Sequence, residues 1–369
     1  MKILCSKSNL LNSVNIVLKA VPTRTTMPIL ECIVIEVNND SIKLIANDME
    51  LGIETLVKGN IEESGIIAIN AKVFSEIVRK LPDNDVSIET DSNNMATIIC
   101  EKSKFTILGR NADEFPFLPN VDKKDPVVLS QFNLKEVIRQ TVFSISDNES
   151  NKIMTGELFE INNDEFRVIS LDGHRISIRK IMLNNQYEHI KVIVPGKTLI
   201  EVSKILSGEV ADEANIYFTD KHIIFEFDDT IVLSRLIEGE YYKIDQMLSS
   251  DYVTKVNINK RELLNCIDRS TLLVKETDKK PIIIHIDDKK MELKINSTIG
   301  SMDEEIDITK EGKDILIGFN PKFLIDALRV IDDEEVEIYF INPKAPCFIK
   351  DKEESYIYII LPVNFNAAV

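Results

Sequence analysis

One short stretch of the sequence combines residue types that could act in catalysis. Asp172 and His174 lie two positions apart within residues 171–176, and a carboxylate so placed could orient an imidazole as a general base. The Asp-Gly pair in the same stretch is also typical of a turn between two strands. A histidine without a nearby nucleophile or metal partner is more often structural, so we favour a turn that presents a binding residue.

Other catalytic and metal-binding patterns are missing from the sequence. The four histidines include no pair three or four positions apart, the spacing of a helical metal site. There is no glycine-rich phosphate loop and no nucleophile elbow. The acidic clusters at 303–305 and 332–335 could bind a divalent ion, but among 61 acidic residues a solvated turn or helix end is the favoured interpretation. We therefore expect no enzyme, no metal and no cofactor.

Composition limits the class of protein and its compartment. The 369 residues are 44% hydrophobic and 28% charged, as in ordinary globular proteins. The five cysteines are far apart, and no apolar run reaches the roughly 18 residues of a membrane span. We expect a cytoplasmic protein without a signal peptide.

Charge gives two conflicting indications about nucleic acid. A net charge of −17 repels nucleic acid at long range. Lysine and arginine nevertheless recur on the predicted helices, and on one common side they would contact phosphates without reading bases. The alternative is a scatter of solvated helix charges.

The elements that carry these residues repeat at intervals of about 125 positions. Helical apolar spacing predicts a first helix at 8–20, 133–143 and 259–272. Asn-Asn-Asp at 38–40 and at 162–164 predicts hairpins between apolar alternating runs. A second helix follows in each copy, and its markers are Lys72, Lys197 and Lys322, each with an acid four residues later at Glu76, Glu201 or Asp326.

Each copy therefore reads helix, hairpin, helix, further strands, which predicts an α+β fold with antiparallel sheets. The proline cluster near residue 120 and a break near residue 247 predict three domains, 1–120, 121–246 and 247–369.

Several strings within this repeat resemble one known family. They are Arg24 followed by Met-Pro-Ile-Leu at 27–30, Ala-Asp-Glu-Phe-Pro at 112–116, Gly-Glu-Leu-Phe-Glu at 156–160, Asp-Gly-His-Arg at 172–175, residues 320–328, and Tyr-Ile-Ile-Leu-Pro-Val at 358–363. In this order they resemble the bacterial DNA polymerase III beta subunits, or beta sliding clamps, over essentially the whole chain.

The resemblance implies three repeated clamp-type (DNA clamp) domains, each with two helices packed on antiparallel sheets. A head-to-tail homodimer would form a six-domain ring around double-stranded DNA. Such a ring is non-catalytic and binds DNA without sequence preference. It tethers the replicative polymerase for processive synthesis in DNA replication. The implied partners are the DNA polymerase III alpha subunit, the clamp loader and other clamp-binding-motif proteins, with no membrane.

The resemblance also implies three sets of site residues. The DNA-facing cations would be Arg24, Lys72, Arg79, Lys80, Arg139, Lys152, Lys197, Lys204, Lys322 and Arg329. The partner-peptide pocket would contain Met154, Leu171, Gly173, His174, Arg175, Ile176, Tyr242, Gln246, Met247, Asn320, Phe323, Pro346, Ile360, Leu361, Pro362 and Val363. The dimer interface would contain Phe105, Ile107, Leu272 and Leu273.

The sequence departs from the family at three pocket positions and at one position near the C-terminus. Leu171 stands in place of a usual Thr, Tyr242 in place of Pro, Gln246 in place of Arg, and Asn364 begins a pair where Arg-Leu is common. These changes affect the expected peptide preference. The alternative function is a peptide-binding scaffold or a diverged clamp paralogue that does not encircle DNA.

Overall fold

The computed structural model describes residues 1–248, 251–274 and 280–365. By its internal contacts the chain divides into two compact units, which we describe separately. The first comprises Met1–Leu134 with Glu201–Leu236, and the second comprises Lys135–Ile200 with Ile237–Val369. The three-domain boundaries expected from the repeat stay a prediction.

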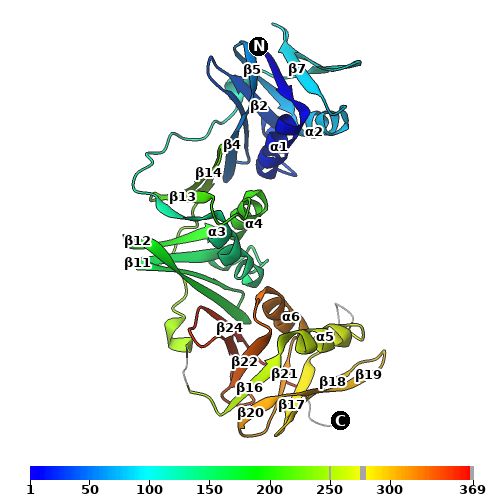
Figure 1. Cartoon of the computed structure of the whole chain (residues 1–369), viewed down its shortest axis with the longest axis vertical. Helices are drawn as coiled ribbons and strands as arrows, with labels where there is room; N and C mark the ends of the chain where they lie inside the picture. The colour runs from blue at the N-terminus through cyan, green and yellow to red at the C-terminus, as the bar shows by residue number, and fades with distance from the viewer. Residues whose placement is uncertain (249–250, 275–279, 366–369) are drawn as a thin grey trace. The chain divides into compact units, whose positions relative to one another are not determined.

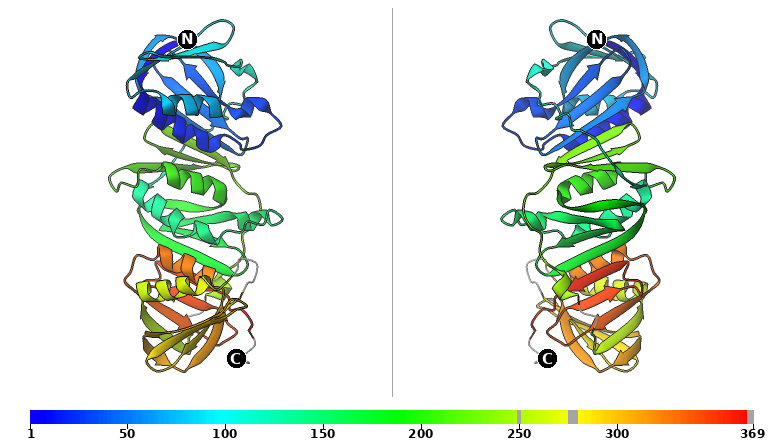
Figure 2. Two further views of the ribbon diagram at one scale, coloured as in Figure 1. Left: turned by 90° about the vertical axis from the view of Figure 1, so that its right-hand side faces the viewer. Right: turned by 90° about the vertical axis from the view of Figure 1, so that its left-hand side faces the viewer.

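The first unit contains two antiparallel sheets (Figures 1 and 2). The five-stranded sheet has the order β5 (Gly59–Glu63), β1 (Lys2–Ser6), β7 (Asp85–Thr90), β8 (Met95–Cys100) and β9 (Ser103–Leu108). The eight-stranded sheet has the order β10 (Val127–Ser130), β13 (Glu213–Phe218), β14 (His222–Phe227), β15 (Thr230–Arg235), β4 (Leu51–Val57), β3 (Ile42–Asn47), β2 (Cys32–Val37) and β6 (Gly65–Asn70).

The second unit contains two further antiparallel sheets (Figure 1). The seven-stranded sheet has the order β11 (Gly156–Leu171), β12 (Arg175–Pro195), β24 (Tyr356–Ile360), β23 (Cys347–Lys350), β22 (Glu335–Phe340), β16 (Thr254–Asn259) and β20 (Thr309–Gly312). The four-stranded sheet has the order β19 (Ser301–Asp307), β18 (Lys290–Asn296), β17 (Ile282–Ile286) and β21 (Ile315–Phe319).

The predicted hairpin at residues 162–164 lies inside β11. The Phe159 and Phe166 rings are 5.1 Å apart, although a straight strand at about 3.3 Å per residue would separate them by about 23 Å. Asn163 has φ +56°, a turn conformation that Asn tolerates. The strand therefore doubles back at Asn163, which confirms the hairpin. Its two arms pair with two segments of β12, residues 156–161 with 190–195 and residues 165–171 with 176–182.

One strand order consequently recurs three times. It is β6-β2-β3-β4 in the first copy, and 190–195, 156–161, 165–171, 176–182 in the second. In the third copy it is β21-β17-β18-β19. A second order also recurs, as β1-β7-β8-β9, β10-β13-β14-β15 and β16-β22-β23-β24. The threefold repeat predicted from the sequence is confirmed.

The helices also follow the repeat. The first helix of each copy is α1 (Lys7–Val17), α3 (Gln131–Arg139) or α5 (Lys260–Thr271), and the second is α2 (Ala71–Lys80), α4 (Gly196–Ile205) or α6 (Pro321–Val330). Asparagine side chains cap three of them, because Asn70, Asn259 and Asn320 accept bonds from backbone amides at 3.0–3.1 Å. The helix predicted at 133–143 ends early, and a 3-10 turn, η4 (Val142–Ser144), follows it.

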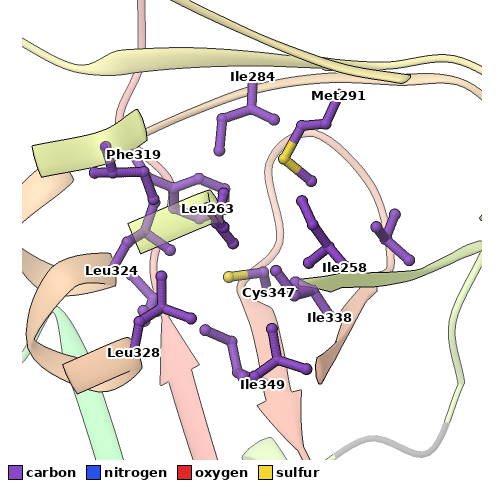
Figure 3. Packing of buried hydrophobic residues seen from close by; sticks show 14 of the residues in the cluster. Ile258, Leu263, Ile284, Met291, Phe319, Leu324, Leu328, Ile338, Cys347 and Ile349 are labelled. Atoms are coloured by element: carbon purple, nitrogen blue, oxygen red, sulfur yellow. The ribbon is translucent and has the colours of Figure 1, made fainter. Parts of the chain in front are cut away.

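The C-terminal core shows how each copy is packed. Buried residues of α5 and α6 lie against apolar residues of both sheets of the second unit. Figure 3 shows Leu324 and Leu328 of α6 near Leu263 of α5, with Cys347 and Ile349 of β23 to the right of the two α6 leucines. Figures 1 and 2 show these two helices side by side. Two helices on antiparallel sheets is the predicted α+β arrangement.

Candidate partner-binding site and cationic helices

The turn at residues 172–174 uses Asp172 structurally. Its carboxylate accepts bonds from the backbone amides of His174 (2.9 Å) and Arg175 (3.1 Å), and from Arg175 Nε (3.0 Å). Gly173 has φ +88°, a region that favours glycine. Because the carboxylate serves the turn and Arg175, the general-base hypothesis for Asp172 and His174 loses its orienting group.

Arg175 is the best-connected residue of the predicted pocket and is 8% exposed. Besides Asp172, it donates to Asp326 of α6 (2.7 Å) and to the Phe143 carbonyl (2.5 Å). Its guanidinium lies 4.6 Å from the Phe323 ring centroid, within cation–π range. Arg175 therefore joins the turn, η4 and α6, and positions them rather than offering a free charge to a ligand.

Strand register brings the next group of predicted residues to one end of the seven-stranded sheet. Arg175 pairs with Ile360, and Ile360 pairs with Cys347. His174, Leu361 and Pro346 therefore lie at the same end, and the Leu361 amide donates to the His174 carbonyl at 2.9 Å. The His174 ring stacks on Phe323 with centroids 6.0 Å apart.

The chain after β24 leads toward the start of α6. Pro362 follows Leu361, and the Val363 amide donates to the Gly318 carbonyl of β21 at 2.8 Å. Asn320 lies two residues beyond Gly318, and its side chain caps α6 through the Lys322 amide. Asn320 thus has a structural role whether or not it also contacts a partner.

An apolar cluster lies against this end of the sheet. Met154 and Ile176 pack on buried Leu171, Tyr241 and Ile359. Ile360, also predicted for the pocket, instead belongs to the core beneath α5 and α6. The exposed apolar residues of this region are Tyr242 (42%), Met247 (57%) and Leu361 (40%), with polar Gln246 exposed beside Met247.

Sequence reasoning missed the residues that hold the site together. Phe143 and Asp326 fix Arg175, Tyr241 anchors the 241–247 loop, and Asn151 bonds to Tyr242. The sequence marked Asp326 only as the acid that follows Lys322 by four residues, a spacing that recurs in each copy. In the other copies that acid pairs elsewhere, since Glu76 pairs with Arg79 and Glu201 with Lys204.

The predicted DNA-facing cations lie mainly on the second helix of each copy. Lys72, Arg79 and Lys80 are exposed on α2, Lys197 and Lys204 on α4, Lys322 and Arg329 on α6, while Arg24 and Lys152 are exposed outside the α-helices. Several of these cations are held in ion pairs. Arg79 pairs with Glu76, Lys204 with Glu201 (2.8 Å), Arg329 with Asp268 (3.1 Å), and Arg139 with Glu136 (2.5 Å) and Asp332 (3.0 Å).

Arg139 is held by two carboxylates, those of Glu136 and Asp332. Its two carboxylate partners raise its pKa, and its side chain is only 35% exposed.

The predicted interface residues lie on or near two sheet edges. Phe105 (39% exposed) and half-buried Ile107 are on β9, the terminal strand of its sheet. Leu272 (78% exposed) and half-buried Leu273 follow α5. Gly300, just before the terminal strand β19, lies close to Leu273.

A cavity of about 770 Å³ lies elsewhere, in the first unit. Met27, Pro28 and Arg110 are among its lining residues, none of which was predicted to bind a partner.

Among the residues the structure describes, no helix is long and apolar enough to cross a membrane. Within the same residues, no group of three or more His, Cys, Asp or Glu is placed to hold a metal ion.

Comparisons with known proteins agree along nearly the whole chain. Residues 1–119, 128–243 and 245–364 match, in that order, the N-terminal, central and C-terminal domains of the DNA polymerase III beta subunit. The beta sliding clamp of Staphylococcus aureus is 34% identical over 365 residues, which cover 96% of this chain and 97% of that protein.

Solved structures show the same relationship. A putative DNA polymerase III beta subunit from Eubacterium rectale is 68% identical, with a TM-score of 0.96, and the match covers 99% of this chain and 100% of that one. The DNA polymerase sliding clamp of Bacillus subtilis is 33% identical, with a TM-score of 0.95 over the same shares. This chain therefore belongs to the DNA polymerase III beta subunit family, the bacterial sliding clamps.

Proposed function

We propose that two copies of this chain close head to tail into a ring around duplex DNA and tether the replicative polymerase for processive synthesis. The protein is a non-catalytic processivity factor, as its family membership establishes. It works with the polymerase alpha subunit, the clamp loader and other proteins that carry the clamp-binding motif. We place this work in the cytoplasm and assign the three clamp domains to 1–120, 121–246 and 247–369.

The observation that carries this proposal is the way neighbouring copies join. β15, the last strand of the second copy, pairs with β4 of the first. β24, the last strand of the third copy, pairs with residues 175–179 of the second, the segment that corresponds to β4. In the described sheets, β9 and β19 occupy the equivalent positions but pair on one side only, β9 with β8 and β19 with β18, and each leaves its outer edge open. Pairing of β9 with the partner's β19 would repeat the same joint and close a ring.

Side chains at these two edges are complementary. Lys102 and Lys104 accompany β9, whereas β19 carries four acidic residues, Asp303, Glu304, Glu305 and Asp307. Three of these acids also pair with cations of their own chain, so Asp307 is the acid on this edge without an ion pair among those the structure records. Opposite charges across paired strands favour one register. The apolar contribution would come from Phe105 and Ile107 meeting Leu272 and Leu273. Exposed edge strands are natural sites for strand addition.

The acidic body and the cationic helices then have separate roles. A net charge of −17 discourages DNA from wrapping the outside. Exposed cations such as Lys72, Lys80 and Lys322 supply sequence-independent phosphate contacts. Retention depends on the closed ring, so these contacts can remain weak enough to permit sliding. Arg139 contributes least, because two carboxylates already hold it.

Partner peptides would dock at the end of the seven-stranded sheet, over the predicted pocket residues. Support comes from the meeting there of His174, Phe323 and Leu361 with the apolar cluster around Leu171. Short peptides that bind such surfaces insert apolar side chains and fix their register with a few polar contacts.

Primer extension on a singly primed circular template tests the proposal. With the loader and polymerase of the same organism, adding this protein should lengthen the products made in one binding event. A protein that binds the polymerase subunit but leaves product length unchanged would instead be a peptide-binding scaffold. His174→Ala should weaken polymerase binding and do no more. If the protein were instead an enzyme that used His174 as a general base, the same change would abolish its reaction.

A further inference from the structure

The loop that carries Tyr242 is fastened to a neighbouring short helix, η5 (Lys152–Thr155), by two contacts. Gly239 has φ +134°, and a side chain added there would meet Ile153 Cδ1 at 3.0 Å, so the loop passes close to η5. Tyr242 follows Gly239 by three residues, and its hydroxyl accepts a hydrogen bond from Asn151 Nδ2 at 2.7 Å. Asn151 directly precedes η5, which carries Met154, so this bond ties two parts of the predicted pocket together.

Both ends of the Tyr242 side chain are therefore held. At the backbone end, Tyr241 is 5% exposed and its hydroxyl donates to the Ile169 carbonyl at 3.1 Å. The Tyr241 and Tyr242 rings meet edge to face, with their centroids 6.2 Å apart. At the far end, Asn151 holds the Tyr242 hydroxyl, yet the residue remains 42% exposed.

An exposed aromatic ring fixed in this way is suited to binding. A side chain that is already ordered loses little conformational entropy when a partner arrives. Tyrosine is among the residues enriched at binding hot spots. The hydroxyl accepts from Asn151, so its own proton stays available to donate to an incoming oxygen atom.

We propose that Asn151 is a positioning residue for partner recognition, an inference that rests on the proposed docking site. Asn151 holds the Tyr242 ring as a rigid wall and leaves the phenol proton for a carbonyl or carboxylate oxygen of the docked segment. An apolar side chain of that segment packs against the ring.

Calorimetric titration with the polymerase III alpha subunit of the same organism tests this role. Asn151→Ala should weaken binding about three- to tenfold, the range of one ordinary hydrogen bond. Tyr242→Phe should weaken it at least as much, and the double variant should be no weaker than Tyr242→Phe alone, because both changes remove one linked interaction. Asn151→Asp keeps the link but accepts the phenol proton, so it too should bind more weakly. Glu149→Gln, exposed in the same loop, is the matched control and should bind like wild type.

The possible outcomes separate the hypotheses. Unchanged affinity in both Asn151 variants would overturn the inference while leaving the docking site intact. Additive losses in the double variant, or a loss matched by a fall in melting temperature, would make Asn151 merely structural and would equally overturn it. If the wild-type protein failed to bind the alpha subunit, the proposed function itself would fail. Weaker binding by the variants at unchanged melting temperature, with a non-additive double variant, is the result we expect.

Discussion

Glu157 is a fully buried acid that the binding functions do not use, and it makes a sharp prediction about stability. It lies on β11 with 0% of its surface exposed, and neither carboxylate oxygen has a hydrogen-bond partner in the structure. The nearby Thr141 hydroxyl opposes the shift only partly, because its proton goes to the Val137 carbonyl at 2.7 Å. Burial therefore raises the pKa of Glu157 well above its ordinary value, because a carboxylate without water or partners is less stable there than the neutral acid.

The sign of the effect follows from proton linkage. The folded state binds a proton that the unfolded state releases above a pKa of about 4.3, so unfolding becomes easier as the pH rises. The stability is fully present below that pH and is lost progressively up to the raised pKa of Glu157. Each pH unit in this window costs about 1.4 kcal/mol. Glu157→Gln keeps the shape and removes the titratable proton, so the stability of the variant relative to wild type should grow as the pH rises through this window, by at most about 1.4 kcal/mol per pH unit.

Urea denaturation of both proteins at a series of pH values measures this difference. Protomer concentration must be fixed, because dimerisation contributes to apparent stability. Glu165→Gln, an exposed acid on the same strand, is the control and should track wild type at every pH. A stability difference between Glu157→Gln and wild type that does not change with pH would contradict this prediction, because Glu157 would then titrate alike in the folded and unfolded states.

Three further predictions concern the ring, the DNA contacts and the site. Leu273→Asp should weaken the dimer by about 100-fold or more, since it buries an unpaired carboxylate. Sedimentation should then show the 42.0 kDa monomer, and an intact dimer would argue against this interface. Lys322→Gln should lower the salt dependence of DNA binding by about one ion, and Arg139→Gln should lower it less because two carboxylates hold that cation; equal effects would contradict this ranking. Arg175→Lys should cost about 1–3 kcal/mol in urea denaturation, because lysine cannot reproduce the planar bonding to three partners; unchanged stability would show that the network is dispensable.

Local signals predicted much of the fold. Helical spacing located the six α-helices of the described residues, and the Asn-Asn-Asp strings located the two hairpins at 38–40 and 162–164, because each depends on residues close together in the chain. The helix expected at 133–143 ended at Arg139 instead. Thr141 there bonds back to the Val137 carbonyl, and a 3-10 turn continues the chain. The residue at which a helix ends depends on which local hydrogen bonds form there, and the spacing of apolar residues does not predict them.

The site was predicted through resemblance, and its supporting contacts were not predicted. Arg175 meets Asp326 because residues 175–179 pair with β24, which is about 180 positions away in the chain. No periodicity in either segment records that pairing. The link between Asn151 and Tyr242 likewise joins residues 91 positions apart. Contacts of this kind arise only once the sheets have assembled.

The protein is proposed to hold DNA by encircling it. The most direct test loads labelled protein onto nicked circular DNA with the clamp loader, isolates the complex by gel filtration in high salt, and then linearises the DNA with a single cut. We expect the protein to stay on the circle and to leave after linearisation, because a closed ring slides off a free end. Equal retention on circular and linear DNA, or no retention on either, would contradict it.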